Sequence, residues 1–207
     1  MNHSHDRLIH WARAYDLTNV LLGRRRKRLR EMFADDLELQ AGDRVLDVGC
    51  GTGQLAMTFA ERVAPTGSVA GIDAAPEMIK RATSQARKQK LPIAFQVAFA
   101  QRLPFPNGSF HAVACTLVLH HVAEDDRQSA VQEMHRVLKP GGRLLIAEFE
   151  RGHGPHQLPR WLLPAAPDHM AEKAYQLVSA AGFTEVRSGP TNLSWLTVIT
   201  ARKGDAP

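Results

Sequence analysis

The sequence has few cysteines, no long hydrophobic run and no internal repeat, and each absence excludes a class of protein. Only 2 of its 207 residues are cysteine. Two cysteines cannot form a disulfide framework, and by themselves they cannot complete a tetrahedral zinc site, so we expect a reducing, cytoplasmic setting. No stretch approaches the roughly 20 apolar residues of a membrane-spanning helix. The first residues also lack the apolar run and small-residue cleavage site of a signal peptide, so we expect an unprocessed, soluble protein.

What remains is the composition of a globular protein, with 44% hydrophobic and 23% charged residues. A chain of this length buries roughly 70% of the surface that its unfolded form exposes, which is enough for one sizeable core. We therefore expect one compact unit. Within it, residues 1–40 form an N-terminal helical cap and residues 41–207 form the main domain.

The net charge of +5 is mild, but much of it is concentrated in a basic run, RRRKRLR, that begins at Arg24 and ends at Arg30. Such a run suggests an anionic neighbour. Contact with an anionic membrane surface is one interpretation, since each basic residue near such a surface adds about 1 kcal/mol. A solvated helix face is the other.

From residue 43 onward, short apolar runs alternate with helix-like segments. The runs are RVLDVG, SVAGID, IAFQVA, FHAVACTLV and GRLLIAEF. Helices are expected over residues 54–62, from Pro76 onward and over residues 125–138. Parallel strands need a crossover between them, so this alternation predicts a doubly wound α/β domain with a mostly parallel sheet and helices on both faces.

The two ends of the chain differ from this pattern. Residues 6–39 show helical spacing, with a break at Gly23 that predicts two short helices. Residues 151–168 are rich in Pro, Gly and His and predict a loop or lid. A helix over 169–181 then ends at Gly182, and the runs FTEVRSG and SWLTVITARK predict an antiparallel pair separated by a turn at Gly189 and Pro190.

The segment VLDVGCGTG, residues 45–53, carries the strongest chemical signal. It places Asp47 at the carboxyl end of the first strand and Gly49, Gly51 and Gly53 in the following turn, where glycines let the backbone approach a ligand closely. Asp73 ends the second strand, where a carboxylate can accept hydrogen bonds from both hydroxyls of a ribose, although a helix N-cap is an alternative role. Together these features predict a nucleoside-containing cofactor.

The spacing also bears on which cofactor binds. A dinucleotide site requires G-x-G-x-x-G and a helix N-terminus that faces a pyrophosphate, whereas this chain has G-x-G-x-G directly after Asp47. A carboxylate at that position would repel a pyrophosphate. It suits a ligand that carries ammonium and sulfonium charge.

With these motifs the chain resembles the class I S-adenosylmethionine-dependent methyltransferases, in the broad subgroup that acts on quinone precursors, phospholipids and small molecules. The resemblance covers residues 15–203 and rests on the blocks YDLTNVLLG, VLDVGCGTG, GIDAAPEMIKRA, LPFPNGSFHAVACTLVLHHV and VLKPGGRLLIAEF. It implies a seven-stranded sheet with the last strand antiparallel, and S-adenosylmethionine as the cofactor. The cofactor-binding residues that it implies are Asp47, Gly49, Gly51, Thr52 and Gly53, then Asp73, Ala74 and Met78, and finally Phe99, Ala100 and Thr116.

One position departs from the family pattern. The family commonly has an acid and then a small residue before the Leu-Pro-Phe block, and the acid accepts a hydrogen bond from the adenine amino group. Here those positions are Phe99 and Ala100. Phe99 cannot accept that bond, so either Gln101 and backbone groups near Ala100 recognise the adenine, or the affinity for the cofactor is reduced. An inactive relative is a further alternative.

Methyl transfer from a sulfonium is an in-line displacement, so the protein mainly has to position the acceptor and exclude water. Where an acceptor must lose a proton, the candidate catalytic residues are His120 and His121 after the fourth strand and Glu148 at the end of the fifth. Packing is the alternative role for the histidines. We expect no metal, because His153 and His156 match no zinc-binding spacing.

The acceptor pocket of this fold is built from the N-terminal helices and the insert after the fifth strand. Both are largely apolar here, with Trp11, Tyr15 and Trp161 among them, which favours a small, partly hydrophobic or lipid-like acceptor. An RNA methyltransferase is an alternative suggested by the basic run, but the Asn-Pro-Pro-aromatic segment of base-amino methyltransferases is missing. A non-catalytic protein that binds the cofactor or a membrane surface is another alternative.

Overall fold

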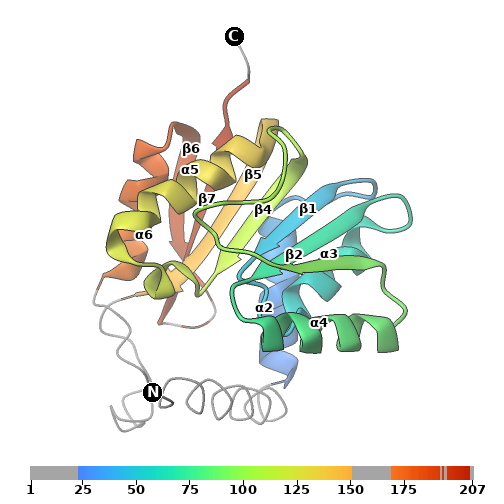
Figure 1. Ribbon diagram of the computed structural model, residues 1–207. Helices are drawn as coiled ribbons and strands as arrows, with labels where there is room; N and C mark the ends of the chain where they lie inside the picture. Colours follow the sequence, from blue (N-terminus) through green and yellow to red (C-terminus); the bar gives the residue numbers. More distant parts are fainter. Residues whose placement is uncertain (1–22, 151–168, 192, 194, 206–207) are drawn as a thin grey trace, which may run out of the picture.

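The computed structural model describes residues 23–150, 169–191, 193 and 195–205 (Figure 1). Its helices are α2 (Gly23–Asp36), α3 (Gln54–Val63), α4 (Pro76–Lys88), α5 (Arg127–Val137) and α6 (Met170–Ala180), with the short 3-10 helices η1 (Leu119–His121) and η2 (Glu124–Asp126). Its strands are β1 (Arg44–Val48), β2 (Ser68–Asp73), β3 (Ile93–Val97), β4 (Phe110–Thr116), β5 (Leu138–Phe149), β6 (Phe183–Pro190) and β7 (Leu196–Lys203).

The strands form one seven-stranded sheet in the order β3-β2-β1-β4-β5-β7-β6. The first five strands pair in parallel, and β7 pairs antiparallel with both β5 and β6. This confirms the predicted doubly wound α/β fold with an antiparallel last strand. The chain winds outward from β1 to β3 and then returns to place β4 on the other side of β1. The carboxyl ends of β1 and β4 are therefore the switch point at which open α/β sheets bind ligands.

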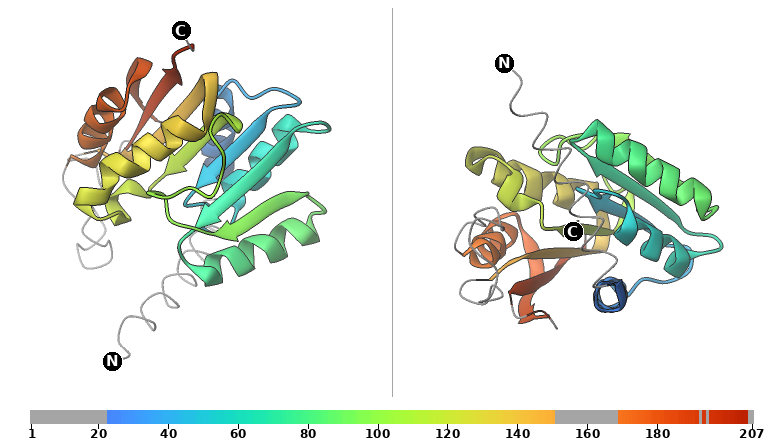
Figure 2. Two further views of the ribbon diagram at one scale, coloured as in Figure 1. Left: turned by 45° about the horizontal axis from the view of Figure 1, so that its top comes forward. Right: turned by 90° about the horizontal axis from the view of Figure 1, so that it is seen from below.

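Helices cover both faces of the sheet (Figure 2). Successive residues of a strand point to opposite faces, so β1 contributes Val45 to the core beneath α2 and α3, and Leu46 to the core beneath α5 and α6. Helix α2 buries Leu29 and Phe33, which lie four residues apart on one side, and Leu37, directly after the helix, is buried too. These two apolar cores fix the carboxyl edge of the central strands in place.

Three boundaries differ from the sequence prediction. Gly189 and Pro190 belong to β6 and pair with Val198 and Thr197 of β7, so the expected turn comes later. Because β6 is an edge strand, a proline without an N–H is tolerated there. The α-helix expected over residues 125–138 begins at Arg127, after η2, and strand β5 begins at Leu138, where a register shift opposite β4 absorbs the extra residues.

Some predictions lie outside the described residues. These are the first N-terminal helix, the loop at 151–168, and the residues expected to line the acceptor pocket there. Among the described helices, none is both long and apolar enough to span a bilayer.

Candidate functional site

The turn after β1 is shaped by its glycines. Gly49, Gly51 and Gly53 all have positive φ angles, of 70°, 53° and 80°, which L side chains rarely adopt. A Cβ atom at Gly49 would overlap the Val118 side chain, and one at Gly53 would lie 2.8 Å from Phe95 Cζ. At Gly51, the described residues place no atom within 4 Å of the position that a Cβ would take, apart from its own chain neighbours. Packing therefore requires glycine at two of these positions, while the third faces open space.

Asp73, the last residue of β2, ties this turn to the start of α4. One carboxylate oxygen accepts a hydrogen bond from Gly51 N at 2.9 Å, and the other accepts one from Ala75 N at 2.9 Å. Each carboxylate oxygen has two lone pairs. Asp73 can therefore hold the backbone and still accept hydrogen bonds from two ribose hydroxyls.

Asp47 is a carboxylate whose environment calls for a ligand. Its side chain is 1% exposed, and Oδ2 is buried without a hydrogen-bond partner among the described residues. Burial, with a smaller contribution from the charge of Asp73, raises the pKa of Asp47 to about 7, and a backbone interaction with Ala56 opposes that rise. A buried charge that lacks a partner is costly. A cationic group of a ligand at Oδ2 would supply one.

The other predicted cofactor residues lie at the same edge of the sheet. Thr52 is buried in the glycine turn, and Thr116 ends β4. Ala74 directly follows Asp73, two residues before α4, and Met78 is the third residue of α4. Ala100 is buried just beyond β3, whereas its neighbour Phe99 is exposed.

The turn after β4 is held by Glu148, which is fully buried. Glu148 Oε1 accepts hydrogen bonds from Val118 N at 3.0 Å and Leu119 N at 2.8 Å, while Oε2 lies 2.9 Å from His120 Nδ1. These bonds stabilise a turn in which Leu117 has a left-handed φ of 58°. The geometry fits a residue that positions the turn better than one that takes a proton from a substrate.

His120 and His121 differ in their surroundings. The His120 ring bonds to Glu148 and packs against Phe149, with a centroid separation of 5.1 Å. His121 is exposed and lies 4.0 Å from the His120 ring, centroid to centroid. Although His121 retains contact with solvent, the surrounding protein partly desolvates its ring, and this desolvation and the neighbouring His120 lower the pKa of His121, against the opposing charges of Glu148 and Asp73. Near neutral pH, His121 is therefore a neutral imidazole that can accept a proton.

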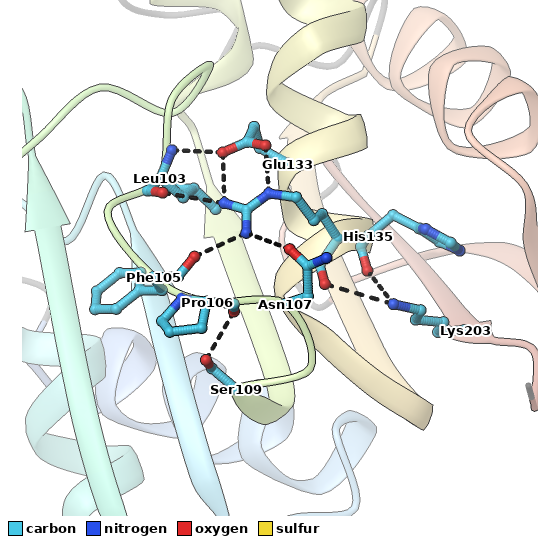
Figure 3. Close-up of polar contacts among 9 residues, drawn as sticks. Leu103, Phe105, Pro106, Asn107, Ser109, Glu133, His135 and Lys203 are labelled. Atoms are coloured by element: carbon cyan, nitrogen blue, oxygen red, sulfur yellow. Dashed lines mark hydrogen bonds and ion pairs between the residues drawn. The ribbon is translucent and has the colours of Figure 1, made fainter.

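The structure also reveals a clamp that the sequence did not suggest (Figure 3). Arg136 of α5 donates hydrogen bonds to the carbonyls of Leu103 and Phe105, at 3.0 and 2.7 Å, and to Asn107 Oδ1 at 2.8 Å. Glu133 binds Arg136 and also accepts Leu103 N at 2.7 Å. The sequence shows only an acid and a base three residues apart on a helix. Their partners lie about 30 residues away in the β3–β4 connection, so no local pattern indicated them.

Within the described ranges, no group of three or more His, Cys, Asp or Glu side chains is arranged to hold a metal ion. His153 and His156 lie outside those ranges. The described residues do provide a buried Asp47 oxygen without a hydrogen-bond partner, the carboxylate of Asp73 and an open glycine, Gly51. This set fits a cofactor with a cationic end and a ribose.

Known proteins provide an independent comparison. A family model described as a methyltransferase domain matches residues 45–142. The ubiquinone/menaquinone biosynthesis C-methyltransferase UbiE of Pseudomonas putida is 40% identical over 143 residues, which is 68% of this chain and 55% of that protein. The chain thus spans about half the length of the curated relatives that it matches. The chain belongs to the class I S-adenosylmethionine-dependent methyltransferases.

Solved structures of this methyltransferase fold are similar over most of the chain. A SAM-dependent methyltransferase from Aquifex aeolicus superimposes with a TM-score of 0.71 at 21% identity, covering 84% of this chain and 89% of that one. The [4+2]-cyclase SpnF superimposes with a TM-score of 0.74 at 25% identity, covering 86% and 82%. The predicted family and fold are confirmed, and S-adenosylmethionine is the cofactor of this family. Because one neighbour is named as a cyclase, the fold alone does not define the reaction.

Proposed function

We propose that this methyltransferase-family chain transfers a methyl group from S-adenosylmethionine to a small, partly hydrophobic acceptor, and that the acceptor is a quinone-like aromatic ring. The observation that carries the proposal is Asp47 Oδ2, which is buried at the carboxyl end of β1 without a hydrogen-bond partner among the described residues. Asp73, at the end of β2, binds Gly51 N of the neighbouring glycine turn. The ring acceptor is supported by the name of the UbiE relative, a quinone-biosynthesis C-methyltransferase.

The two carboxylates are proposed to bind different parts of the cofactor. Asp47 is placed to accept hydrogen bonds from the ammonium group, and Asp73 to accept them from the ribose hydroxyls. S-adenosylmethionine, when bound, supplies an electrophilic methyl group. The contribution of the chain is then to orient the acceptor and to keep water away from the reacting atoms.

His121 is proposed as the proton acceptor. Removing the proton of a ring hydroxyl increases the electron density of the ring and makes its carbon a better nucleophile. A neutral imidazole at the rim of the site suits this role, and the lowered pKa of His121 keeps the ring neutral near pH 7. Glu148 and His120 act through the backbone turn that presents His121.

We also propose that residues 1–40 form one unit with the main domain and that the basic run of α2 contacts an anionic membrane surface. Leu29 and Phe33 of α2 belong to the same apolar core as Phe59 of α3, which supports the single unit. Arg25, Lys27 and Arg28 are exposed, which supports the surface contact. Such a contact would suit a lipid-linked quinone precursor and gives the basic run a role that does not require RNA.

The test is a label-transfer assay with methyl-labelled S-adenosylmethionine. Three acceptors are compared: a demethylated prenyl hydroquinone, phosphatidylethanolamine vesicles and a structured RNA. We expect label in the hydroquinone and a large loss of that label in the variant Asp47→Asn. Label in RNA alone would contradict the proposed function. Conversion of the hydroquinone without transfer of label, as expected of a cyclase, would contradict it too.

A further inference from the structure

Phe99 is an aromatic side chain at an unusual position. It is 59% exposed, the highest value among the large hydrophobic residues that are exposed in the described part of the chain. It follows β3 by two residues, and the segment AFAQR at 98–102 contains no carboxylate. Nothing in the two apolar cores requires a phenyl ring there.

The strand order indicates what such a ring would face. Asp47 and the glycine turn follow β1, Asp73 ends β2, and β3 is the next strand outward. Asp73 and Val97 are paired residues, and Ala98 N donates a hydrogen bond to the Asp73 carbonyl at 3.1 Å. A nucleoside whose ribose is held at Asp73 and whose amino-acid end is held at Asp47 therefore directs its base away from β1, toward the turn that carries Phe99.

That turn is fixed in place. Arg102 N donates a hydrogen bond to the Phe99 carbonyl at 3.1 Å, and Gln101 Nε2 donates one to Asp126 Oδ2 at 3.3 Å. Directly after it, the Arg136–Glu133 clamp holds the segment from Leu103 onward to α5 (Figure 3). An exposed ring on a fixed turn loses little conformational entropy when a ligand covers it.

We propose that Phe99 is a specificity-determining residue that stacks on the purine of the cofactor. The affinity for the cofactor then comes from contact with the face of the purine ring and depends little on the 6-amino group. This inference rests on the proposed use of S-adenosylmethionine. Aromatic rings stack favourably on nucleic-acid bases whatever the base, because every base has a π face. A phenyl group offers no acceptor for an amino group, so the usual hydrogen bond is replaced by stacking.

Calorimetric titration of the full chain tests this with two ligands. One is S-adenosylhomocysteine, and the other is its 6-deamino analogue, in which hydrogen replaces the purine amino group and the ring nitrogens are unchanged. We expect the two Kd values to agree within about threefold for the natural sequence. In Phe99→Asp, the new carboxylate can accept a hydrogen bond from the amino group, so S-adenosylhomocysteine should bind about 10- to 100-fold more tightly than its deamino analogue. In Phe99→Leu, both should weaken by the same factor, about 3- to 10-fold.

Controls separate this inference from the proposed function. Phe99→Tyr keeps the ring and should bind both ligands as the natural sequence does, and Tyr175→Leu, which removes an exposed ring on α6, should change neither Kd. If S-adenosylhomocysteine binds but its deamino analogue is more than about tenfold weaker, or if Phe99→Leu changes neither Kd, the role of Phe99 is refuted while the cofactor assignment stands. Failure of S-adenosylhomocysteine itself to bind overturns both.

Discussion

Asp47 has the environment least favourable to an ordinary carboxylate, because it is almost fully buried and one of its oxygens has no partner among the described residues. The buried charge without a partner destabilises the free protein, and a cationic ligand that pairs with the charge removes this unfavourable free energy. The residue was predictable from sequence because an acid at the end of the first strand, directly before a glycine turn, is a local pattern. Its burial, and hence its raised pKa, depends on packing and required the structure.

The raised pKa of Asp47, about 7, predicts opposite pH effects on folding and on ligand binding. An acid whose pKa is higher in the folded than in the unfolded state stabilises the fold at low pH, and this stability is lost as the pH rises from about 4 to about 7. In Asp47→Asn, the free energy of unfolding at pH 8 should therefore increase by up to about 4 kcal/mol. Urea denaturation of both proteins without cofactor measures this.

For binding, the direction reverses, because only the ionised Asp47 can pair with the ligand ammonium group. The affinity for S-adenosylhomocysteine should rise as the pH increases toward about 8, and Asp47→Asn should be weaker and independent of pH over that range. An affinity of the natural sequence that stays constant between pH 5.5 and 8 would count against this role.

His121 gives a prediction about rate. Replacing it by Gln removes the proposed proton acceptor, so kcat for the hydroquinone should fall by about 10²- to 10⁴-fold, while the Kd of S-adenosylhomocysteine stays unchanged. Because the pKa of His121 is lowered, the acidic limb of the kcat profile in the natural sequence should lie below the ordinary histidine value of about 6.5. Equal kcat values for the two proteins would remove His121 from the mechanism.

At the scale of elements, the turn after β4 depends on Glu148 of β5. Glu148→Ala leaves the N–H groups of Val118 and Leu119 without their acceptor, which should lower the free energy of unfolding by about 2–5 kcal/mol. Glu148→Gln retains an oxygen that can accept from both N–H groups, so its free energy of unfolding should fall much less. Chemical denaturation of the two variants decides whether Glu148 acts by positioning, and comparable losses in both would contradict that account.

The elements also show where sequence information ends. Periodicity predicted α3, the start of α4 and most strands because each buries a regular apolar stripe. The contacts of Arg136 and Glu148 were not predictable, since both residues bind backbone groups about 30 positions away and backbone groups carry no sequence signal. For the same reason, Gly189 and Pro190 were interpreted as a turn, although pairing with β7 keeps them in a strand.

At the scale of the whole molecule, the basic surface of α2 is expected to bind anionic membranes. Replacing exposed Arg25, Lys27 and Arg28 by Gln should weaken co-sedimentation with phosphatidylglycerol vesicles by about 100-fold, at about 1 kcal/mol per charge. A matched control removes three exposed charges from α4, namely Lys80, Arg87 and Lys88, and should bind as the natural sequence does. Equal losses in both variants would indicate a net-charge effect with no specific surface.

The arrangement of the molecule explains why one edge of the sheet carries the chemistry. The reversal of strand order between β1 and β4 separates the turns that follow them, and Asp47, Asp73 and His121 all lie along that edge. The alternation of strands and helices in the sequence was sufficient to predict this edge. It was not sufficient to predict the acceptor, whose expected pocket residues lie outside the described part of the chain.

The measurement that tests the central claim most directly is a calorimetric titration of the purified protein with S-adenosylmethionine and S-adenosylhomocysteine, beside the variant Asp73→Ala. The account predicts micromolar binding of both ligands to the natural sequence and a loss of about 10- to 100-fold in the variant, the worth of hydrogen bonds to a charged group. Absence of binding to the natural sequence, or equal binding to the variant, would contradict the assignment of the cofactor to this edge of the sheet.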